Sequence, residues 1–339
     1  MVAKLFMSKN TLNTISELTG VSVSTVSRVL SGQAEKYRIS PVTAGKIREA
    51  AEQCGYIPDL VAKGLRTRRT GTVGLTIPNI DNPFFSSLSC ILVSELKRLG
   101  LHVLLADSME LEKEESEALN MFISRRVDGI IAVPVGDSAS ELERISTRIP
   151  VVLVDRYFPE SKLPFVGTDN YHGAYMAVDY LIGRGYRNIL GIQGNLTAVS
   201  NRERVRGMED AIAAHSGMRS RVDGDSFSVE NGKTIMEKIL SGKDRPDAVF
   251  AFSSNILLGA IMIIREAGLR IPEDIAILSF DNNGFLDYLD PAITRVEQPL
   301  PEIGRLAATL LFDLMEGKSS DEITKGTLLS PSLVIRNSC

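Results

Sequence analysis

The chain has 339 residues, 44% hydrophobic and 24% charged, which is typical of a folded globular protein and excludes a disordered one. Its three cysteines contain no CxxC pair, which excludes a disulfide framework and a cysteine-based zinc cluster. No apolar run reaches the roughly 18 residues of a membrane span. Residues 1–13 lack a signal-peptide core. We therefore expect a cytoplasmic protein without membrane contact.

The net charge of −4 conceals an uneven distribution. Residues 1–70 carry eleven Lys and Arg against five Asp and Glu, whereas residues 71–339 carry 27 against 37. An acidic body with a basic end is typical of a nucleic-acid-binding head on a separate domain. On charge alone, a chance distribution over the surface remains the alternative.

Residues 13–30 predict two short helices around a tight turn at Gly20. Thr14 or Asn13 is expected to cap the first helix, with Glu17 in a capping box, and Ser22 to cap the second. The apolar residues of both helices are spaced to form one small core: Ile15, Leu18, Val21, Val26, Val29 and Leu30.

The outer face of the second helix carries short hydroxyl side chains and one cation. Hydroxyls allow close approach to a phosphate backbone, and Arg28 can donate two parallel hydrogen bonds to a guanine edge. The alternative is a helical hairpin whose polar face meets only water. The residues on this face are Ser22, Ser24, Thr25, Ser27 and Arg28.

A third helix is predicted to begin at Ser40-Pro41 and to end at Cys54-Gly55. Together with the segment Tyr56–Arg66, these motifs closely resemble the headpiece of the LacI/GalR family of bacterial transcription repressors, from Thr14 to Thr72. The resemblance implies that the second helix lies in the major groove. Its base-facing residues would be Val23, Ser24 and Arg28, and the phosphate-facing ones Thr14, Ser22, Thr25, Ser27 and Tyr56.

The resemblance also implies a hinge helix over Asp59–Leu65 that forms on operator DNA, with Ala62 and Leu65 at the minor groove. A helix this short that contains Gly64 is not stable alone. Asp59 departs from the neutral residue common in the family, which makes a phosphate contact there doubtful. Residues 32–39 form a long loop similar to that of fructose- and sucrose-type members, in which Lys36, Tyr37 and Arg38 contact phosphates or are merely solvated.

From Thr72 onward, apolar strands alternate with amphipathic helices, which predicts parallel sheets covered on both faces. We therefore predict an α/β protein: an all-α helix-turn-helix headpiece followed by a two-lobed, doubly wound periplasmic-binding-protein-like domain. The predicted domains are a headpiece over 12–57, a hinge and linker over 58–71, and an effector-binding and dimerisation domain over 72–339. Its lobe one comprises 72–168 with about 299–327, and its lobe two 169–298.

This second region resembles type I periplasmic sugar-binding proteins, in which a ligand binds between the lobes. Ligands of open α/β sheets bind beyond the carboxyl ends of the strands. Carboxylates accept from hydroxyls, arginine donates two hydrogen bonds, and aromatic faces cover a sugar ring. The residues assigned by motif are Asn82, Phe84, Phe85, Asp155, Arg156, Arg202, Phe227, Ser253, Asp281 and Gln298.

One feature of the sequence leaves the identity of the ligand open. Ser253-Ser254 stands where relatives have Asn-Asp, which puts the usual sugar identity in doubt. A sugar or sugar phosphate is the first expectation, and a nucleobase or nucleoside the second. An internal Asp–Arg network with core phenylalanines is the alternative reading of the same residues.

The sequence contains no GxSxG, GxxxxGK[ST] or GxGxxG motif in a suitable position, so we expect no enzyme, cofactor or metal. We predict a homodimeric repressor that binds a palindromic operator under control of a small ligand. A sugar transport component and an α/β enzyme are the rival functions. The first does not need the segment Ser22–Leu30, and the second lacks a catalytic group.

Overall fold

The computed structural model describes residues 11–56, 69–318 and 325–339. The chain divides into two compact units, Met1–Thr70 and Gly71–Cys339, each described here by itself. The predicted hinge helix, with Ala62 and Leu65, lies outside the described residues. Within them, no helix is both long enough and apolar enough to cross a membrane.

Within its described residues, the first unit contains three helices, α1 (Leu12–Thr19), α2 (Val23–Leu30) and α3 (Pro41–Gln53). Ser22 caps α2 by accepting from the amide of Thr25 at 3.2 Å, which confirms the prediction. Ser40 caps α3 in the same way, with Pro41 in the first turn. Gly20 ends α1 at φ 70°, where glycine carries no steric penalty.

The start of α1 differs from the prediction. Thr11 is the N-cap, and it forms a reciprocal capping box with Thr14, so the helix begins before the expected caps Asn13 and Thr14. The predicted core residue Leu18 is 63% exposed. Because α1 is short, it turns only a narrow stripe inward, centred on the fully buried Ile15. Val26, Val29 and Ile47 complete the centre of this core.

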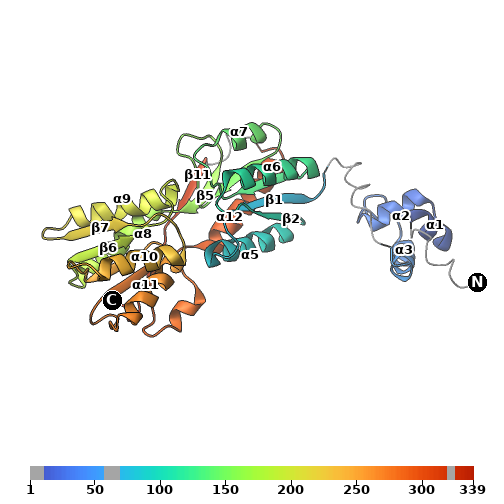
Figure 1. Cartoon of the computed structure of the whole chain (residues 1–339). Coiled ribbons are helices and arrows are strands. Elements are labelled where there is room, and N and C mark those ends of the chain that lie inside the picture. Colours follow the sequence, from blue (N-terminus) through green and yellow to red (C-terminus); the bar gives the residue numbers. More distant parts are fainter. Residues whose placement is uncertain (1–10, 57–68, 319–324) are drawn as a thin grey trace, which may run out of the picture. The chain divides into compact units, whose positions relative to one another are not determined.

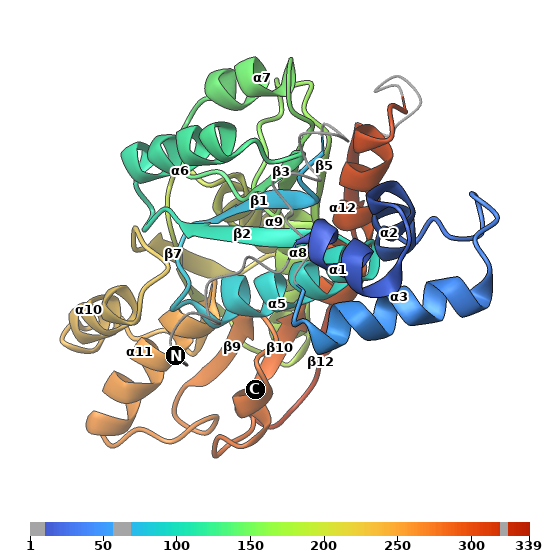
Figure 2. The same ribbon diagram turned by 90° about the vertical axis from the view of Figure 1, so that its right-hand side faces the viewer.

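Lobe one of the second unit is a six-stranded sheet in the order β11-β5-β4-β3-β1-β2, with all neighbours parallel. Figures 1 and 2 show α5 and α6 on opposite sides of β1 and β2. Helices α5 and α12 pack on one core, and α6 and α7 on the other. The elements are β1 (Thr72–Ile77), α5 (Pro83–Arg98), β2 (His102–Asp107), α6 (Glu112–Arg125), β3 (Gly129–Ala132), α7 (Ser140–Ser146), β4 (Val151–Val154), β5 (Phe165–Thr168), α12 (Leu300–Met315) and β11 (Gly326–Leu329).

Lobe two repeats this arrangement with the strand order β12-β10-β9-β8-β6-β7, in which only β12 is antiparallel to its neighbour. Figure 1 shows α9 and α10 on opposite sides of this sheet. The elements are α8 (Asn170–Gly183), β6 (Asn188–Ile192), α9 (Val199–Ala213), β7 (Arg219–Asp223), α10 (Val229–Leu240), β8 (Ala248–Ala251), α11 (Ser254–Glu266), β9 (Ala276–Phe280), η1 (Gly284–Asp287), β10 (Thr294–Glu297) and β12 (Ser332–Val334).

The burial of the strands explains why the sequence forms two covered sheets. The central strands β3, β4, β8 and β9 are buried along their whole length, as expected of parallel strands covered on both faces. The edge strand β7 is partly exposed and polar, which discourages pairing with other chains, and the edge strand β2 is also partly exposed. The predicted fold class is confirmed.

The chain passes between the lobes three times, after β5, after β10 and after β11. Each crossover is a short segment between the elements of the two lobes. The carboxyl ends of the parallel strands of both lobes carry the residues described below.

In lobe two, α8 and α9 pack closely enough to require a glycine. A Cβ at Gly207 would lie 2.2 Å from the backbone oxygen of Tyr171, which cannot move aside as a side chain can. Gly183, at the end of α8, is exposed, and a Cβ there would meet nothing within 4 Å.

We predict that Gly207→Ala lowers the free energy of unfolding by roughly 1–3 kcal/mol, because overpacking forces the two helices apart. Gly183→Ala is the matched control, and it should raise the free energy of unfolding by about 0.5 kcal/mol because alanine lowers the entropy of the unfolded chain. Urea unfolding followed by circular dichroism measures both. Equal effects of the two substitutions would contradict close packing at Gly207.

Candidate functional site

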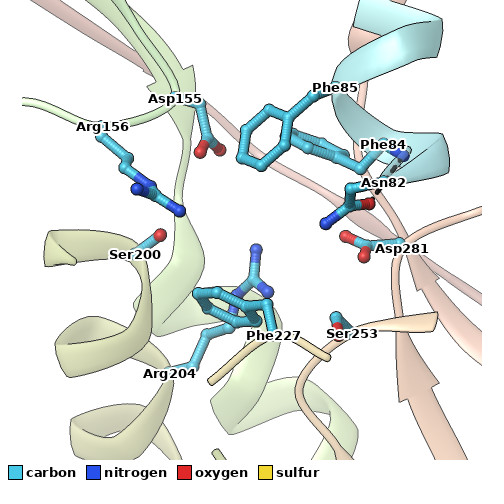
Figure 3. A pocket seen from close by; sticks show the side chains of 10 residues that line it. All are labelled: Asn82, Phe84, Phe85, Asp155, Arg156, Ser200, Arg204, Phe227, Ser253 and Asp281. Atoms are coloured by element: carbon cyan, nitrogen blue, oxygen red, sulfur yellow. Dashed lines mark hydrogen bonds between the residues drawn. The ribbon is translucent and has the colours of Figure 1, made fainter. Parts of the chain in front are cut away.

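A pocket lies where the carboxyl ends of strands from both lobes meet, and we call it the inner pocket (Figure 3). Its volume is about 20 Å³, room for about one water molecule. Lobe one contributes the residues that follow β1 and β4, and lobe two those that follow β7, β8 and β9 and one face of α9. The lining residues are Asn82, Phe84, Phe85, Asp155, Arg156, Ser200, Arg204, Phe227, Ser253 and Asp281.

Two buried carboxylates line this pocket, one from each lobe. Asp155 follows β4 in lobe one, and Asp281 follows β9 in lobe two. Both have a left-handed backbone, at φ 64° and φ 78°, a conformation that is uncommon for residues other than glycine. Such strain concentrates at functional sites, where the surrounding structure maintains it. The strain aims two carboxylates at one space.

Arg204 is the cation between these carboxylates. It lies on α9, is buried, and donates through Nε to Asn170 Oδ1 at 2.8 Å and through Nη1 to the backbone oxygen of Phe252. Its guanidinium carbon lies 3.7 Å from the ring centroid of Phe280. Burial lowers the pKa of Arg204, and the charges of Asp281 and Asp155 oppose this effect. An arginine with two carboxylates beside it stays protonated.

A hydrogen-bonded chain holds Asp281 from behind. Gln298 donates through Nε2 to Asp281 Oδ1 at 2.6 Å, and its Oε1 accepts from Thr168 Oγ1 at 2.6 Å. Thr168 and Gln298 belong to two of the three crossovers between the lobes. Burial raises the pKa of Asp281, while Arg204 and Gln298 favour its charged form. Gln298 therefore positions Asp281 without itself lining the pocket.

Two polar atoms at the lobe-one side of the pocket have no hydrogen-bond partner. They are Asp155 Oδ1 and Arg156 Nε, both buried. The two Nη atoms of Arg156 are occupied, since each donates at 2.8 Å to one carboxylate oxygen of Glu110. Burial raises the pKa of Asp155 to about 6, although Arg204 and Arg156 favour its charged form. A buried acceptor and a buried donor without partners are costly, and a polar ligand would satisfy both.

Aromatic rings form the walls of the pocket. Phe84 and Phe85 pack edge to face with centroids 5.1 Å apart, at the start of α5, where Asn82 accepts from the amide of Phe84 at 3.0 Å. Phe227 lies on the lobe-two side, and the guanidinium carbon of Arg204 is 5.9 Å from its centroid. Figure 3 shows the arginine and aspartate heads directed into the space between these rings.

The structure brings together most of the residues that the sequence assigned to this site. Asn82, Phe84, Phe85, Asp155, Arg156, Phe227, Ser253 and Asp281 line the inner pocket. Ser253 also caps α11 by accepting from the amide of Ile256 at 3.3 Å. Ser253 therefore both lines the inner pocket and caps the helix α11.

Arg202 is a correction, because the structure places it outside the inner pocket. It is exposed and donates through Nη1 to the backbone oxygen of Thr197 at 2.8 Å. Helix α9 begins at Val199, and at 100° per residue the face that carries Ser200 carries Arg204 one turn later. Arg202 lies on the opposite side of that helix. The sequence prediction missed Arg204, since no residue pattern marks the face of α9 that carries Ser200 as the buried one.

In the first unit, the outer face of α2 is open. Ser22, Val23, Ser24 and Arg28 are exposed, and Thr25 is partly so. The guanidinium carbon of Arg28 lies 4.0 Å from the ring centroid of Tyr37, which belongs to the loop between α2 and α3. A cation on an aromatic face keeps its orientation. Thr14 and Ser27 are partly buried, and Tyr56 packs against the core of this unit.

Comparisons with known proteins agree with this arrangement of a helical headpiece and a two-lobed ligand-binding domain. The sequence profile "Bacterial regulatory proteins, lacI family" matches residues 11–59, and the profile "Periplasmic binding protein-like domain" matches residues 178–339. Catabolite control protein A of Priestia megaterium is 31% identical, over 92% of this chain and 94% of its own length. The HTH-type transcriptional repressor CytR of Escherichia coli (strain K12) is 29% identical, over 100% of this chain and 98% of its own.

Solved structures are similar to the whole chain as well. The lac repressor dimer bound to operator and the anti-inducer ONPF has a TM-score of 0.88 over 98% of this chain and 99% of that one, at 24% identity, a likeness of fold alone. The transcriptional regulator CelR in complex with cellobiose has a TM-score of 0.71 at 29% identity, over 97% and 99% of the two chains.

The fold and the two sites define a DNA-binding transcription regulator with a ligand-binding effector domain. The chain belongs to the LacI family of bacterial regulatory proteins. The relatives named above are regulators rather than enzymes.

The raised pKa of Asp155 makes a prediction about stability. A buried carboxyl with a pKa of about 6, against 3.8 when unfolded, destabilises the folded state once it ionises. The contribution of Asp155 to the free energy of unfolding therefore falls as pH rises from about 4 to 6 and levels off above. Asp155→Asn removes the charge and keeps the shape, so it should raise the free energy of unfolding at pH 7 by on the order of 2 kcal/mol.

Denaturant unfolding at pH 5 and pH 7 tests this, and the gain should be larger at pH 7. Asp274→Asn is the control of opposite sign, because Arg270 holds the pKa of the exposed Asp274 at about 2. That substitution should not stabilise the protein. If Asp155→Asn is less stable than the unsubstituted protein at pH 7, the neighbouring arginines outweigh the cost of burial.

Proposed function

We propose that this protein is a transcription repressor whose affinity for operator DNA is controlled by a carbohydrate bound in the inner pocket. The observation that carries the proposal is the pair of buried carboxylates around Arg204, with Asp155 Oδ1 and Arg156 Nε left without partners. Hydroxyl groups donate to carboxylates and accept from guanidinium groups, so a polyol satisfies both atoms. The phenylalanine rings cover the apolar face of a sugar.

The related regulator CelR, in its complex with cellobiose, supports the carbohydrate class. The inner pocket has room for only about one water molecule, so the ligand enters when the lobes part. The lobes are joined by the three crossovers, which can act as the hinge of such a motion. A ligand that contacts Asp155 in lobe one and Asp281 in lobe two then favours one separation of the lobes.

On the DNA side, α2 is the proposed reading helix. Its exposed residues Val23, Ser24 and Arg28 are proposed to face bases, and its hydroxyl residues to face phosphates. Tyr37 supports Arg28, since a guanidinium stacked on a ring loses less rotational freedom on binding. Thr14, Ser22, Thr25, Ser27 and Tyr56 are the proposed phosphate contacts, and Ala62 and Leu65 stay predicted minor-groove residues.

A homodimer is the proposed assembly, acting in the cytoplasm, where its DNA is. One headpiece reads one half-site, so two symmetric headpieces read a palindrome. The lac repressor, to which the chain is similar in fold, is described as a dimer on its operator. A change in lobe separation, transmitted across a dimer, alters the spacing of the two headpieces and hence their fit to the two half-sites.

Arg28→Ala should lower the discrimination between operator and random duplex by about 1–3 kcal/mol, because a bidentate contact to guanine is lost. Binding to random DNA should change much less. Arg48→Ala, an exposed arginine on α3, is the matched control, and it should leave discrimination unchanged. Titrations of an operator selected from random duplexes, over a range of salt, measure both quantities. Equal losses for operator and random DNA would refute base reading by Arg28.

Arg204→Gln and Asp281→Asn should weaken effector binding by about tenfold or more, because each removes a charge-assisted hydrogen bond. Operator affinity without ligand should persist. Arg206→Gln, exposed on the same helix, is the control. Thermal unfolding against monosaccharides, disaccharides, sugar phosphates and nucleosides identifies the ligand, and operator titration with it gives the response. A nucleoside as the best ligand would replace the carbohydrate class, and a normal response in both variants would place the site elsewhere.

A further inference from the structure

A second and larger hollow lies beside the inner pocket in the same domain, and we call it the outer hollow. Its volume is about 240 Å³. It lies between the loops that follow β3 and β4 in lobe one and the loop that follows β6 in lobe two. None of the interactions assigned to the inner pocket requires this space.

The lining of the outer hollow combines apolar and polar groups. Tyr157 and Phe158 are half-buried, and Leu196 in the loop after β6 is 54% exposed. Asp137 and Glu160 are exposed carboxylates at the lobe-one side, and Arg202 is the exposed cation at the lobe-two side. Donors, acceptors and apolar faces therefore surround one space.

Arg156 joins the two cavities, since it lines both. It is only 4% exposed, and its Nε has no partner. Helix α9 also borders both, with Ser200 in the inner pocket and Val199 in the outer hollow. A ligand in the inner pocket that accepts a hydrogen bond from Arg156 Nε therefore lies beside the outer hollow, and a substituent on that ligand can extend into the outer hollow.

We propose that the outer hollow holds the second sugar residue of a two-residue effector, whose first residue occupies the inner pocket. This inference rests on the proposed carbohydrate effector. The half-buried aromatic rings and Leu196 cover the apolar faces of a sugar ring, and the carboxylates and Arg202 bind its hydroxyls. The effector is accordingly a disaccharide, and not a monosaccharide.

The charges of the outer hollow favour a neutral sugar over a phosphate group. Asp137 and Glu160 face it from lobe one and repel a dianion. Both terminal nitrogens of Arg156 are committed to Glu110, and Arg202 already donates to the backbone oxygen of Thr197. Both cations that border the hollow, Arg156 and Arg202, therefore already have an acceptor. Each can still donate a further hydrogen bond to a sugar hydroxyl.

The full-length protein tests this by calorimetric titration with glucose, galactose, fructose and glucose 6-phosphate, and with cellobiose, maltose, trehalose, sucrose and lactose. One disaccharide should bind at least about tenfold more tightly than any of its monosaccharides, since it makes additional contacts. Leu196→Asn and Arg202→Gln should each remove most of that advantage and leave monosaccharide binding unchanged. Arg206→Gln, one turn further along α9 and exposed, is the matched control and should change neither affinity.

The possible failures are distinct. If a monosaccharide binds as tightly as every disaccharide, or if the outer substitutions weaken both kinds of ligand equally, the outer hollow is not a sugar subsite, and the proposed function stands. If glucose 6-phosphate binds best and Arg202→Gln removes its advantage, the hollow takes a phosphate and the inference is wrong. If no carbohydrate binds, both the inference and the carbohydrate effector are overturned.

Discussion

The arrangement of the effector domain depends on one buried cation shared between its two lobes. Arg204 belongs to lobe two, and the carboxylates that stabilise its charge come from Asp281 in the same lobe and Asp155 in the other. A buried charge without partners costs several kcal/mol, so removing Arg204 would leave two carboxylates uncompensated. The attraction between Arg204 and these carboxylates acts both within lobe two and between the lobes, and the same groups line the pocket that a ligand enters. A ligand that binds in the inner pocket must either replace the attraction between Arg204 and the two carboxylates or add hydrogen bonds to these groups.

The two lobes contribute equivalent aspartates, Asp155 and Asp281, to the inner pocket. Each sheet has the same strand order, and in each a left-handed aspartate follows a fully buried strand. The two aspartates differ in their surroundings, however. Asp281 is held by Gln298 and the amide of Ser254, whereas Asp155 Oδ1 has no partner. The lobe-two carboxylate is thus fixed before a ligand arrives, and the lobe-one carboxylate is left to be satisfied by it.

Much of this could be predicted from the sequence, because strand ends and helix caps are local features. The apolar runs predicted most of the sheets, and strand ends together with the family resemblance predicted eight of the ten lining residues. What failed depended on helix phase. Arg202 and Arg204 both lie on α9, about 200° apart around the helix, so only one of them can face the inner pocket. Leu18 lies three residues after the fully buried Ile15, yet it is 63% exposed, because the inward stripe of the short helix α1 is narrow.

Other features could not be read from the sequence, because they join distant segments. Thr168, Gln298 and Asp281 form one chain across 130 residues, and Glu110 meets Arg156 across 46. No local pattern predicts such pairs, since their geometry exists only after both lobes have folded.

The unsatisfied atoms also explain how a small ligand can act on DNA at all. A ligand shifts an equilibrium only by the difference between its affinities for the two states. Asp155 Oδ1 and Arg156 Nε lie in lobe one, whereas Arg204 and Asp281 lie in lobe two, so only a state with the lobes close together offers all four groups to one molecule. Each charge-assisted hydrogen bond contributes about 1.5–3 kcal/mol. Two that form in one state and not in the other suffice to move a balanced equilibrium almost completely, and the effector needs no contact with the headpiece.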